Sequence, residues 1–177
     1  MVTIVTALLE TGPVPVTEPA FIFGFTAPGP LLEWSWAEER LRAARNFWIA
    51  TPAPDGMPHP RPMWGFWRNG SFWFSSVNRQ TAFLASDGKA VLHTESGDEV
   101  VIIDGTVQRL FGKENLQVIS TGYKEKYNHD TNATDDGVYT LEGYGGPGWK
   151  LTPKTALGWI APQFNTATRW VFPAAGS

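Results

Sequence analysis

The stretch "HPRPMWGFWRNGSFWFSS", residues 59–76, joins two aromatic, strand-like runs through a short polar turn. Asn69-Gly70 is a strong signal for a two-residue β-hairpin turn. The sequence therefore predicts one strand over residues 59–67 and a second over 71–76, paired across this turn.

An arginine stands between two prolines at the start of this stretch. Pro60 and Pro62 carry no backbone N–H, which is typical of a sheet edge or a strand start. Arg61 is thereby held on a stiff, extended backbone, where a guanidinium can bind a phosphate or carboxylate through two hydrogen bonds. The alternative is an ordinary surface arginine at a strand end.

The segment "SSVNRQT", residues 75–81, follows the hairpin and offers hydroxyls, an amide and a cation. It stands where a strand is expected to pass into a helix over 79–86, and helix N-terminal N–H groups favour anions. A plain capped helix with Asn78 as N-cap is the alternative. Because the hairpin is expected to place strand 59–67 beside strand 71–76, both anion-binding candidates would converge.

The rest of the chain predicts one domain after an N-terminal arm. Residues 1–33 lack a helical or strand period, and we expect an irregular arm that packs on the body through Phe21, Ile22, Phe23 and Phe25. One domain is expected over residues 34–177. Its first expected elements are a helix over 36–45 with a Ser35/Glu38 capping box, strands at 47–51, 89–95 and 99–110, and a helix within 112–127. In this second helix Leu116, Ile119, Tyr123 and Tyr127 stand at helical spacing. A polar loop over 128–148 and two short strands or one bent strand from Trp149 follow.

Consecutive hairpins with period-2 patterns favour antiparallel pairing, and this many strands favours a barrel over an open sheet. The fold class is therefore mainly β with a few helices.

Composition excludes several functional classes. The 177 residues carry a net charge of −3 and no basic stretch, which argues against nucleic acid as a partner. The absence of cysteine excludes disulfides, thiolate metal sites and cysteine nucleophiles, and three scattered histidines predict no metal site. No signal peptide or membrane span is evident, so we expect a cytoplasmic protein. Nine tryptophans indicate a rigid core, a subunit interface or a flat pocket.

Two further positions have a structural and a functional interpretation. Arg169 beside Trp170 near the C-terminus could cap a pocket with a stacked indole, or the tail could simply pack through Trp170 and Phe172. His93 lies within an expected strand, where a histidine is more often structural than catalytic. No spacing suggests a nucleophilic triad.

Three segments together resemble the pyridoxamine 5'-phosphate oxidase-like, FMN-binding split-barrel family, and in particular its small actinobacterial-type oxidoreductase members. They are "WSWAEERLRAARNFWIATPAPDGMPHPRPMWGFWRNGSFWFSS", "HTESGDEVVIIDGTVQRL" and "ATRWVF". The resemblance implies a six-stranded antiparallel split barrel and a homodimer with the flavin at the interface.

The resemblance also implies which residues bind the cofactor. They are Arg61, Pro62, Met63, Trp64, Gly65, Phe66, Phe74, Ser75, Ser76, Arg79, Gln80, Arg169 and Trp170. Where the family has a Ser-Arg-Lys triplet for the phosphate, this chain has Asn78-Arg79-Gln80, which removes one positive charge. Charge-assisted hydrogen bonds are about twice as strong as neutral ones, so this change bears on FMN affinity and on the choice of cofactor.

The implied function is an FMN-dependent oxidoreductase acting on a small organic substrate, with NAD(P)H or oxygen as the other redox partner. The flavin carries the redox chemistry in such proteins, so no catalytic residue is assigned. Two alternatives remain. One is the same barrel with a deazaflavin coenzyme. The other is a barrel that has lost its flavin, filled by aromatic residues, which binds or transforms an apolar metabolite without redox chemistry.

Overall fold

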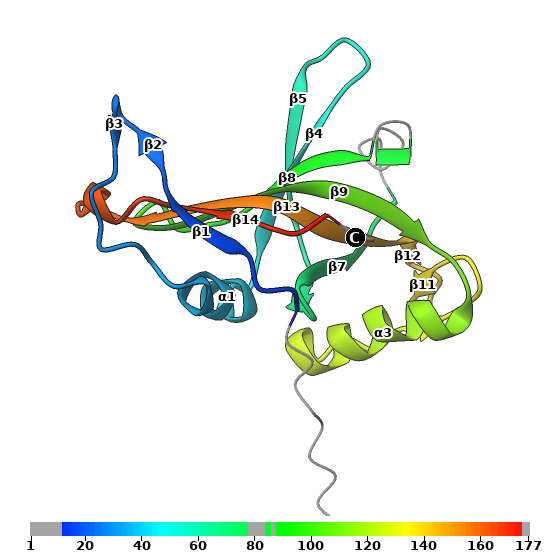
Figure 1. The fold of residues 1–177 in the computed structure, drawn as a ribbon. Helices are drawn as coiled ribbons and strands as arrows, with labels where there is room; N and C mark the ends of the chain where they lie inside the picture. The colour runs from blue at the N-terminus through cyan, green and yellow to red at the C-terminus, as the bar shows by residue number, and fades with distance from the viewer. Residues whose placement is uncertain (1–11, 78–83, 86–87, 175–177) are drawn as a thin grey trace, which may run out of the picture.

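The structure, a computed structural model, describes residues 12–77, 84–85 and 88–174. Figure 1 shows one large, strongly twisted antiparallel sheet with both helices on the same side of it. The helices are α1 (Trp34–Ala43) and α3 (Lys113–Tyr127). The main-sheet strands are β1 (Val16–Pro19), β4 (Phe47–Pro52), β5 (Pro58–Met63), β6 (Phe66–Arg68), β7 (Ser71–Ser75), β8 (Lys89–Thr94), β9 (Glu99–Leu110), β13 (Gly148–Ile160) and β14 (Thr168–Val171).

The strand order of the main sheet is β1-β14-β13-β9-β8-β4-β5, with β7 paired to both β13 and β6. Antiparallel pairing and the mainly β class agree with the sequence-based prediction. The described part of the main sheet has nine strands, where six were expected. The difference arises partly because β1 and β14 extend one edge and because the predicted strand 59–67 is divided in two.

The sheet splits along β13, the long strand at its centre. Over its whole length β13 pairs with β9, while on its other side it pairs first with β7 and then with β14. The change of partner occurs at a register shift between Pro153 and Thr155. Proline cannot donate to a strand ladder and is tolerated at bulges, so Pro153 explains why one bent strand forms here.

The Asn69-Gly70 turn is confirmed. Both residues have positive φ, 51° and 66°, and Phe66–Arg68 pairs with Ser71–Trp73 across the turn. The prediction of one strand over 59–67 is wrong, because the chain leaves the sheet at Trp64 and Gly65. The first half, β5, pairs with β4 at the sheet edge, and only the second half, β6, pairs with β7.

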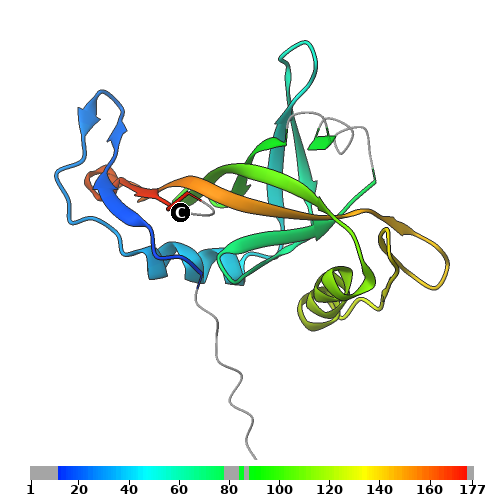
Figure 2. The same cartoon turned by 45° about the vertical axis from the view of Figure 1, so that its right-hand side comes forward.

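The described part of the N-terminal arm is not irregular. Strand β1 pairs with β14 and becomes part of the main sheet, and β2 (Phe21–Ile22) pairs with β3 (Phe25–Thr26). Figure 2 shows this small hairpin standing away from the body. The expected anchor holds only in part. Ile22 packs against the buried residues Ala20, Ala27 and Ala167, and the Phe23 ring meets Phe164 edge-on with centroids 4.8 Å apart. Phe21, in contrast, is 71% exposed.

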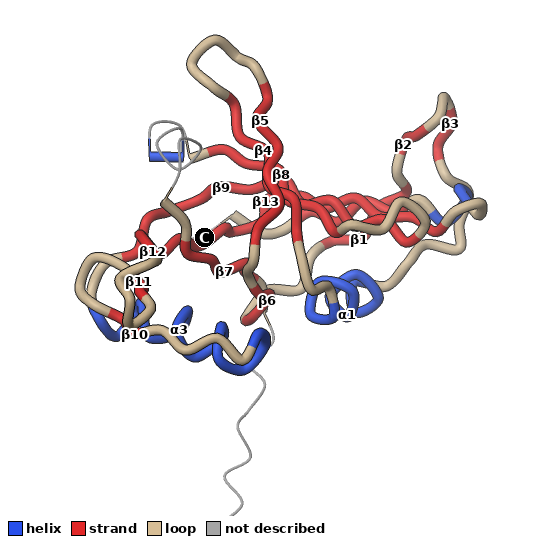
Figure 3. Tube along the Cα trace, turned by 180° about the vertical axis from the view of Figure 1, so that it is seen from behind, coloured by secondary structure: helices blue, strands red, loops and turns tan. Residues whose placement is uncertain are grey.

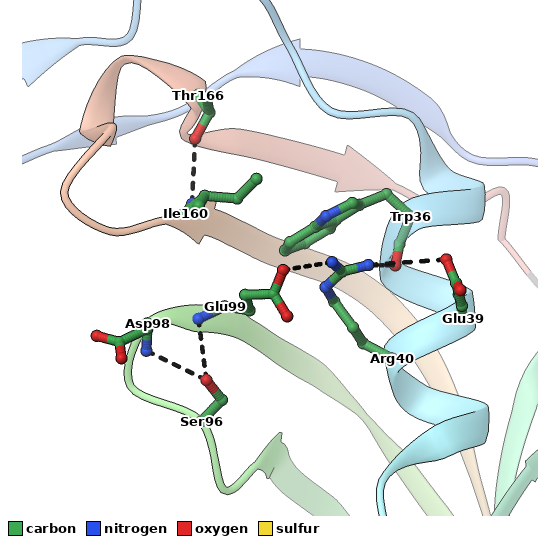
Figure 4. A network of polar contacts seen from close by, with 8 residues as sticks. All are labelled: Trp36, Glu39, Arg40, Ser96, Asp98, Glu99, Ile160 and Thr166. Carbon is green, nitrogen blue, oxygen red and sulfur yellow. Dashed lines mark hydrogen bonds and ion pairs between the residues drawn. The ribbon is translucent and has the colours of Figure 1, made fainter.

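The helix α1 begins earlier than predicted, and its buried residues are Ala37 and Leu41. Its N-cap is Glu33 with no side-chain cap, so the predicted capping box at Ser35 is wrong. Figure 4 shows how α1 is tied to β9: Arg40 pairs with Glu99 and lies 4.0 Å over the Trp36 ring. In α3, Leu116, Ile119 and Tyr123 are buried.

The segment 128–148, expected to be a loop, contains a small three-stranded sheet. Its strands are β10 (Asn132–Ala133), β11 (Val138–Tyr139) and β12 (Gly145–Gly146). Figure 3 shows this sheet beside α3 at one end of the molecule. The chain then closes with β13, a 3₁₀ turn (Phe164–Thr166) and β14. The helix expected over 79–86 falls largely outside the described residues.

Candidate functional site

The predicted cofactor-binding residues fall into three groups. Exposed or half-buried are Arg61, Pro62, Trp64, Ser75, Ser76 and Arg169. Buried are Met63, Gly65, Phe66, Phe74 and Trp170. Arg79 and Gln80 lie outside the described residues. Side chains of the second group contribute to packing, so direct contact with a ligand falls to the first.

Arg61 lies on the edge strand β5, as the flanking prolines predicted. Pro58, Pro60 and Pro62 alternate along this strand, so the residues between them must supply the hydrogen bonds to β4. The Arg61 side chain is exposed, and its Nη1 donates to the Pro60 carbonyl oxygen at 2.9 Å. The guanidinium is therefore open to an anion from solvent on a stiff backbone.

The break between β5 and β6 is held by side chains from the end of α3. The Tyr127 hydroxyl accepts a hydrogen bond from the Gly65 amide at 2.9 Å and lies 2.6 Å from the Gly65 carbonyl oxygen. Lys126 Nζ donates to the same carbonyl oxygen at 3.0 Å. Because Gly65 is buried, these bonds satisfy polar atoms that have left the sheet ladder.

A second tyrosine joins this break to the end of β7. The Tyr123 hydroxyl accepts from the Ser75 amide at 2.7 Å and lies 3.3 Å from the Trp64 carbonyl oxygen. Burial raises the pKa of Tyr123, so the hydroxyl stays protonated. Trp64 and Ser75 were both predicted to bind the cofactor, and the Tyr123 hydroxyl joins their backbones.

The Trp64 indole is fixed on this same helix end. It stacks on Tyr127 with ring centroids 4.5 Å apart and an interplanar angle of 4°, and His129 meets it edge-on at 5.7 Å. The Arg45 guanidinium lies 5.8 Å from the indole and 5.7 Å from the Tyr127 ring. Trp64 nevertheless remains 41% exposed, so part of its surface is available to a ligand.

Two cations lie close to this aromatic group. Burial, and then the neighbouring Arg45 charge, lowers the pKa of Lys126 to about 8. Among the described residues, neither Arg45 nor Lys126 forms a salt bridge. The site is therefore positively charged beside a flat, partly exposed ring.

Arg169 and Trp170 lie far from Arg61 within one chain. Arg169 forms a salt bridge with Glu18 of β1 at 3.1 Å, while the Trp170 indole is fully buried in the main core. The strand register places Arg169, Leu157, Ile102, His93, Trp48 and Pro62 in one row across the sheet. Pro62 and Arg169 are five strand spacings apart in that row, about 24 Å at about 4.8 Å per strand.

The contribution of α3 to the site was not predicted from the sequence. Tyr123 and Tyr127 were expected only at helical spacing within this helix, and no role was expected for Lys126. A signal was present, because a tyrosine hydroxyl on a buried face needs a hydrogen-bond partner. The sequence could not say which backbone atoms would be that partner. His93 has a structural setting, stacked on Trp48, with Nδ1 2.7 Å from the Thr94 carbonyl oxygen.

The described part of the chain offers neither a cluster of metal ligands nor a helix that could span a membrane. There, no three acidic or histidine side chains lie close enough together to hold a metal ion. Neither described helix combines the length and the apolar character needed to cross a membrane.

No protein-family model and no curated protein matches this sequence. Solved structures do match the fold. A protein from Clostridium acetobutylicum related to general stress protein 26, of the pyridoxinephosphate oxidase family, is 13% identical, with a TM-score of 0.55 over 73% of this chain and 92% of its own. A FAD-binding protein from Mesorhizobium loti is 12% identical, with a TM-score of 0.55 over 80% and 96%.

An F420 reductase is 16% identical, with a TM-score of 0.53 over 67% of this chain and 94% of its own. At these identities the likeness concerns the fold. The chain therefore has the split-barrel fold of the pyridoxamine 5'-phosphate oxidase-like proteins, as the sequence resemblance implied.

Proposed function

We propose that this protein is a flavin-dependent oxidoreductase that acts on a small organic substrate, with FMN as its cofactor. The observation that carries the proposal is the placement of Arg61 and Trp64. Both are exposed, both belong to the stretch that leaves the sheet edge, and Tyr123 links this stretch to Ser75 at the end of β7. Proteins of the same fold include a FAD-binding protein and an F420 reductase.

The residues present fit a flavin through side chains more than through backbone. The Arg61 guanidinium suits a phosphate, and the exposed part of Trp64 suits a flat ring. The Ser75 hydroxyl donates to the Gly146 carbonyl oxygen at 2.9 Å and can still accept a hydrogen bond. The Gly65 and Ser75 amides are already bonded to tyrosine hydroxyls and are not available to a ring edge.

When bound, the flavin supplies the hydride chemistry. The chain's own groups bind and orient it: Arg61 holds the anionic end, and Trp64, fixed by Tyr127, limits the approach of water. Lys126 and Arg45 keep this region positive, which favours an anionic cofactor or substrate. Because the pKa of Lys126 is lowered to about 8, this lysine is mostly charged at neutral pH but can lose its proton readily.

The functional unit is proposed to be a homodimer. Arg61 and Arg169 lie on strands at opposite ends of the paired row in one chain, and a two-fold partner can bring its own Arg169 to the Arg61 edge. The sheet face between them carries Trp48, Ile102 and Leu157, which are only half-buried in one protomer. Such a partly apolar face is suited to a subunit interface.

A deazaflavin coenzyme is the alternative cofactor. Its long acidic tail requires cations near the groove, and Lys126 and Arg45 supply two beside Trp64. A barrel without flavin, which binds an apolar metabolite, is the non-redox alternative.

The test is a calorimetric titration of the purified protein with FMN and, separately, with the deazaflavin coenzyme, read together with the absorbance spectrum. FMN is expected to bind with flavin absorbance. Arg61→Gln is expected to weaken binding by about tenfold or more, because a charge-assisted bond is lost. Arg109→Gln, an exposed arginine on β9, is the matched control and should bind as wild type. Tighter binding of the deazaflavin would show that the deazaflavin, and not FMN, is the cofactor. If neither compound binds, the proposal is rejected.

A further inference from the structure

A cavity opens on the main sheet. Its volume is about 400 Å³, within the usual range for sites of small organic ligands. Residues of β4, β8, β9 and β13, Pro58 at the start of β5, and the turn that joins β4 to β5 line it. Figure 1 shows this β4–β5 hairpin rising beyond the sheet beside β8. None of the described residues predicted to bind the cofactor lines this cavity, and Arg79 and Gln80 lie outside the described residues.

The register shows that the cavity is on the outer face of the sheet. On β4 the residues Phe47, Ile49 and Thr51 are buried in the core, so Ala50 between them points outward. Ala50 pairs with Val91, and Val91 pairs with Asp104, so these three side chains share the outer face. Small and apolar residues therefore form the floor, which leaves room for a ligand.

Charged side chains stand around this floor. Lys154 is the extra residue of the β13 bulge, because Pro153 pairs with Gly105 and Thr155 with Asp104. Bulges commonly redirect a side chain next to a binding site, and Lys154 lines the cavity together with Asp104. Within the described residues the Lys154 ammonium has no ion-pair partner.

Lys89, at the start of β8, is the second cation in the lining. Asp104 is the one described carboxylate there, and its Oδ2 accepts a hydrogen bond from the Thr155 hydroxyl at 3.1 Å. Lys154 offers one positive charge to a ligand, and Asp104 adds a negative charge to the same lining. This arrangement suits a single negative charge on the ligand better than a dianion, which Asp104 would repel more strongly.

We propose that this cavity binds a small organic monoanion, namely a carboxylate on an apolar or aromatic body. Lys154 holds the carboxylate, and the apolar body lies on Ala50 and Val91. Binding here is measured without any flavin, so the test separates this proposal from the choice of cofactor. The cavity shares the outer sheet face with Trp48 and Ile102 of the proposed subunit interface, so the proposal requires that it stays open in the dimer.

The test is isothermal titration calorimetry of the flavin-free protein with 2-naphthoate, its neutral analogue 2-naphthalenemethanol, and 2-naphthyl phosphate. The naphthoate is expected to bind about tenfold or more tightly than the alcohol, since the alcohol lacks the charge that Lys154 recognises. The phosphate, as a dianion, is expected to bind more weakly than the naphthoate. Equal affinities for naphthoate and alcohol, or tighter binding of the phosphate, would overturn the proposal.

Variants identify the site. Lys154→Gln is expected to lower naphthoate affinity about tenfold with no change for the alcohol. Lys150→Gln is the matched control, since Lys150 lies on the same strand but over the Trp73 ring, 4.9 Å from its centroid. Ala50→Leu should fill the cavity and weaken both ligands. An unaltered affinity in Lys154→Gln, or no binding by wild type because a second copy covers the face, would each refute the site.

Discussion

The hydroxyl of Tyr127 bonds both backbone polar atoms of Gly65, accepting from the amide at 2.9 Å and lying 2.6 Å from the carbonyl oxygen. Gly65 belongs to the short segment where the chain leaves β5 and enters β6, and there the sheet ladder no longer satisfies its N–H and C=O. One side chain from α3 therefore satisfies the backbone groups that the break between β5 and β6 leaves without a ladder partner.

The first prediction concerns this bond. Tyr127→Phe keeps the ring that stacks on Trp64 but leaves the buried Gly65 amide without its partner. We expect the free energy of unfolding to fall by about 1–3 kcal/mol, the usual cost of an unsatisfied buried group. Urea unfolding measures it. Tyr144→Phe, at a position 76% exposed, should change stability by less than about 0.5 kcal/mol. Equal stability of the two variants would show that the bond is not structural.

Lys126 is expected to make the free energy of unfolding depend on pH. Its pKa is lowered from 10.5 to about 8 by burial and by Arg45, so between these values the unfolded chain binds more protons than the folded one. Its contribution to stability therefore rises with pH from about 8 to 10.5. The unfolding free energy of wild type minus that of Lys126→Met should therefore increase with pH over this window.

NMR of the lysine side-chain signals checks the cause. Arg45→Gln should raise the pKa of Lys126, because one of the two causes of its depression is removed. The explanation would be contradicted if the stability difference between wild type and Lys126→Met did not change with pH. It would also be contradicted if Arg45→Gln left the pKa of Lys126 unchanged.

The substitution Gly122→Ala is expected to lower stability, although helix propensity alone favours alanine. Alanine is normally better than glycine inside a helix by about 1 kcal/mol. Here a Cβ at residue 122 would lie 2.2 Å from atoms of the Phe66 ring, so Gly122→Ala should destabilise by about 1–3 kcal/mol. The cost should shrink in a Phe66→Leu background, which a double-mutant cycle in urea measures. A stabilised Gly122→Ala would mean that α3 does not pack this closely on β6.

The contact between α1 and β9 gives a further prediction. The Arg40 side chain is 24% exposed and pairs with Glu99, while Glu39 is 3.8 Å away and 80% exposed (Figure 4). Glu99→Gln should cost about 1–3 kcal/mol because a mostly buried guanidinium loses its charged partner. Glu39→Gln should cost less than about 0.5 kcal/mol. Thermal or urea unfolding compares the two, and a reversed order would be inconsistent with the network.

Local patterns predicted much of the fold. Asn69-Gly70 predicted the β6–β7 turn, and the spacing of Leu116, Ile119 and Tyr123 predicted α3. The break at Trp64 was not predictable from periodicity, because the aromatic pattern continues through it. Contacts between distant parts of the chain decide the break. A Cβ at residue 65 would lie 2.2 Å from the Phe72 ring. The backbone groups of Gly65 are bonded by Tyr127 and Lys126, which lie some sixty positions away in the sequence.

The candidate site was predictable to a similar extent. The edge placement of Arg61 follows from Pro60 and Pro62, because proline removes ladder donors. The convergence of Arg61 with the 75–81 segment on one hairpin does not hold as predicted, since β5 pairs with β4 and not with β7. Strand pairing is a tertiary property that turn residues fix only for the strands on either side of the turn.

The proposed flavin site is assembled from Arg61 of one protomer and Arg169 of the other, and mixing two variants tests this arrangement most directly. Arg61→Gln and Arg169→Gln are each expected to bind FMN weakly. After unfolding and refolding together in equal amounts, about a quarter of the sites should contain both arginines and bind FMN as wild type does. An equilibrium titration that shows this tight fraction supports the account. A mixture no better than its components, or a wild type that takes up no FMN, contradicts it.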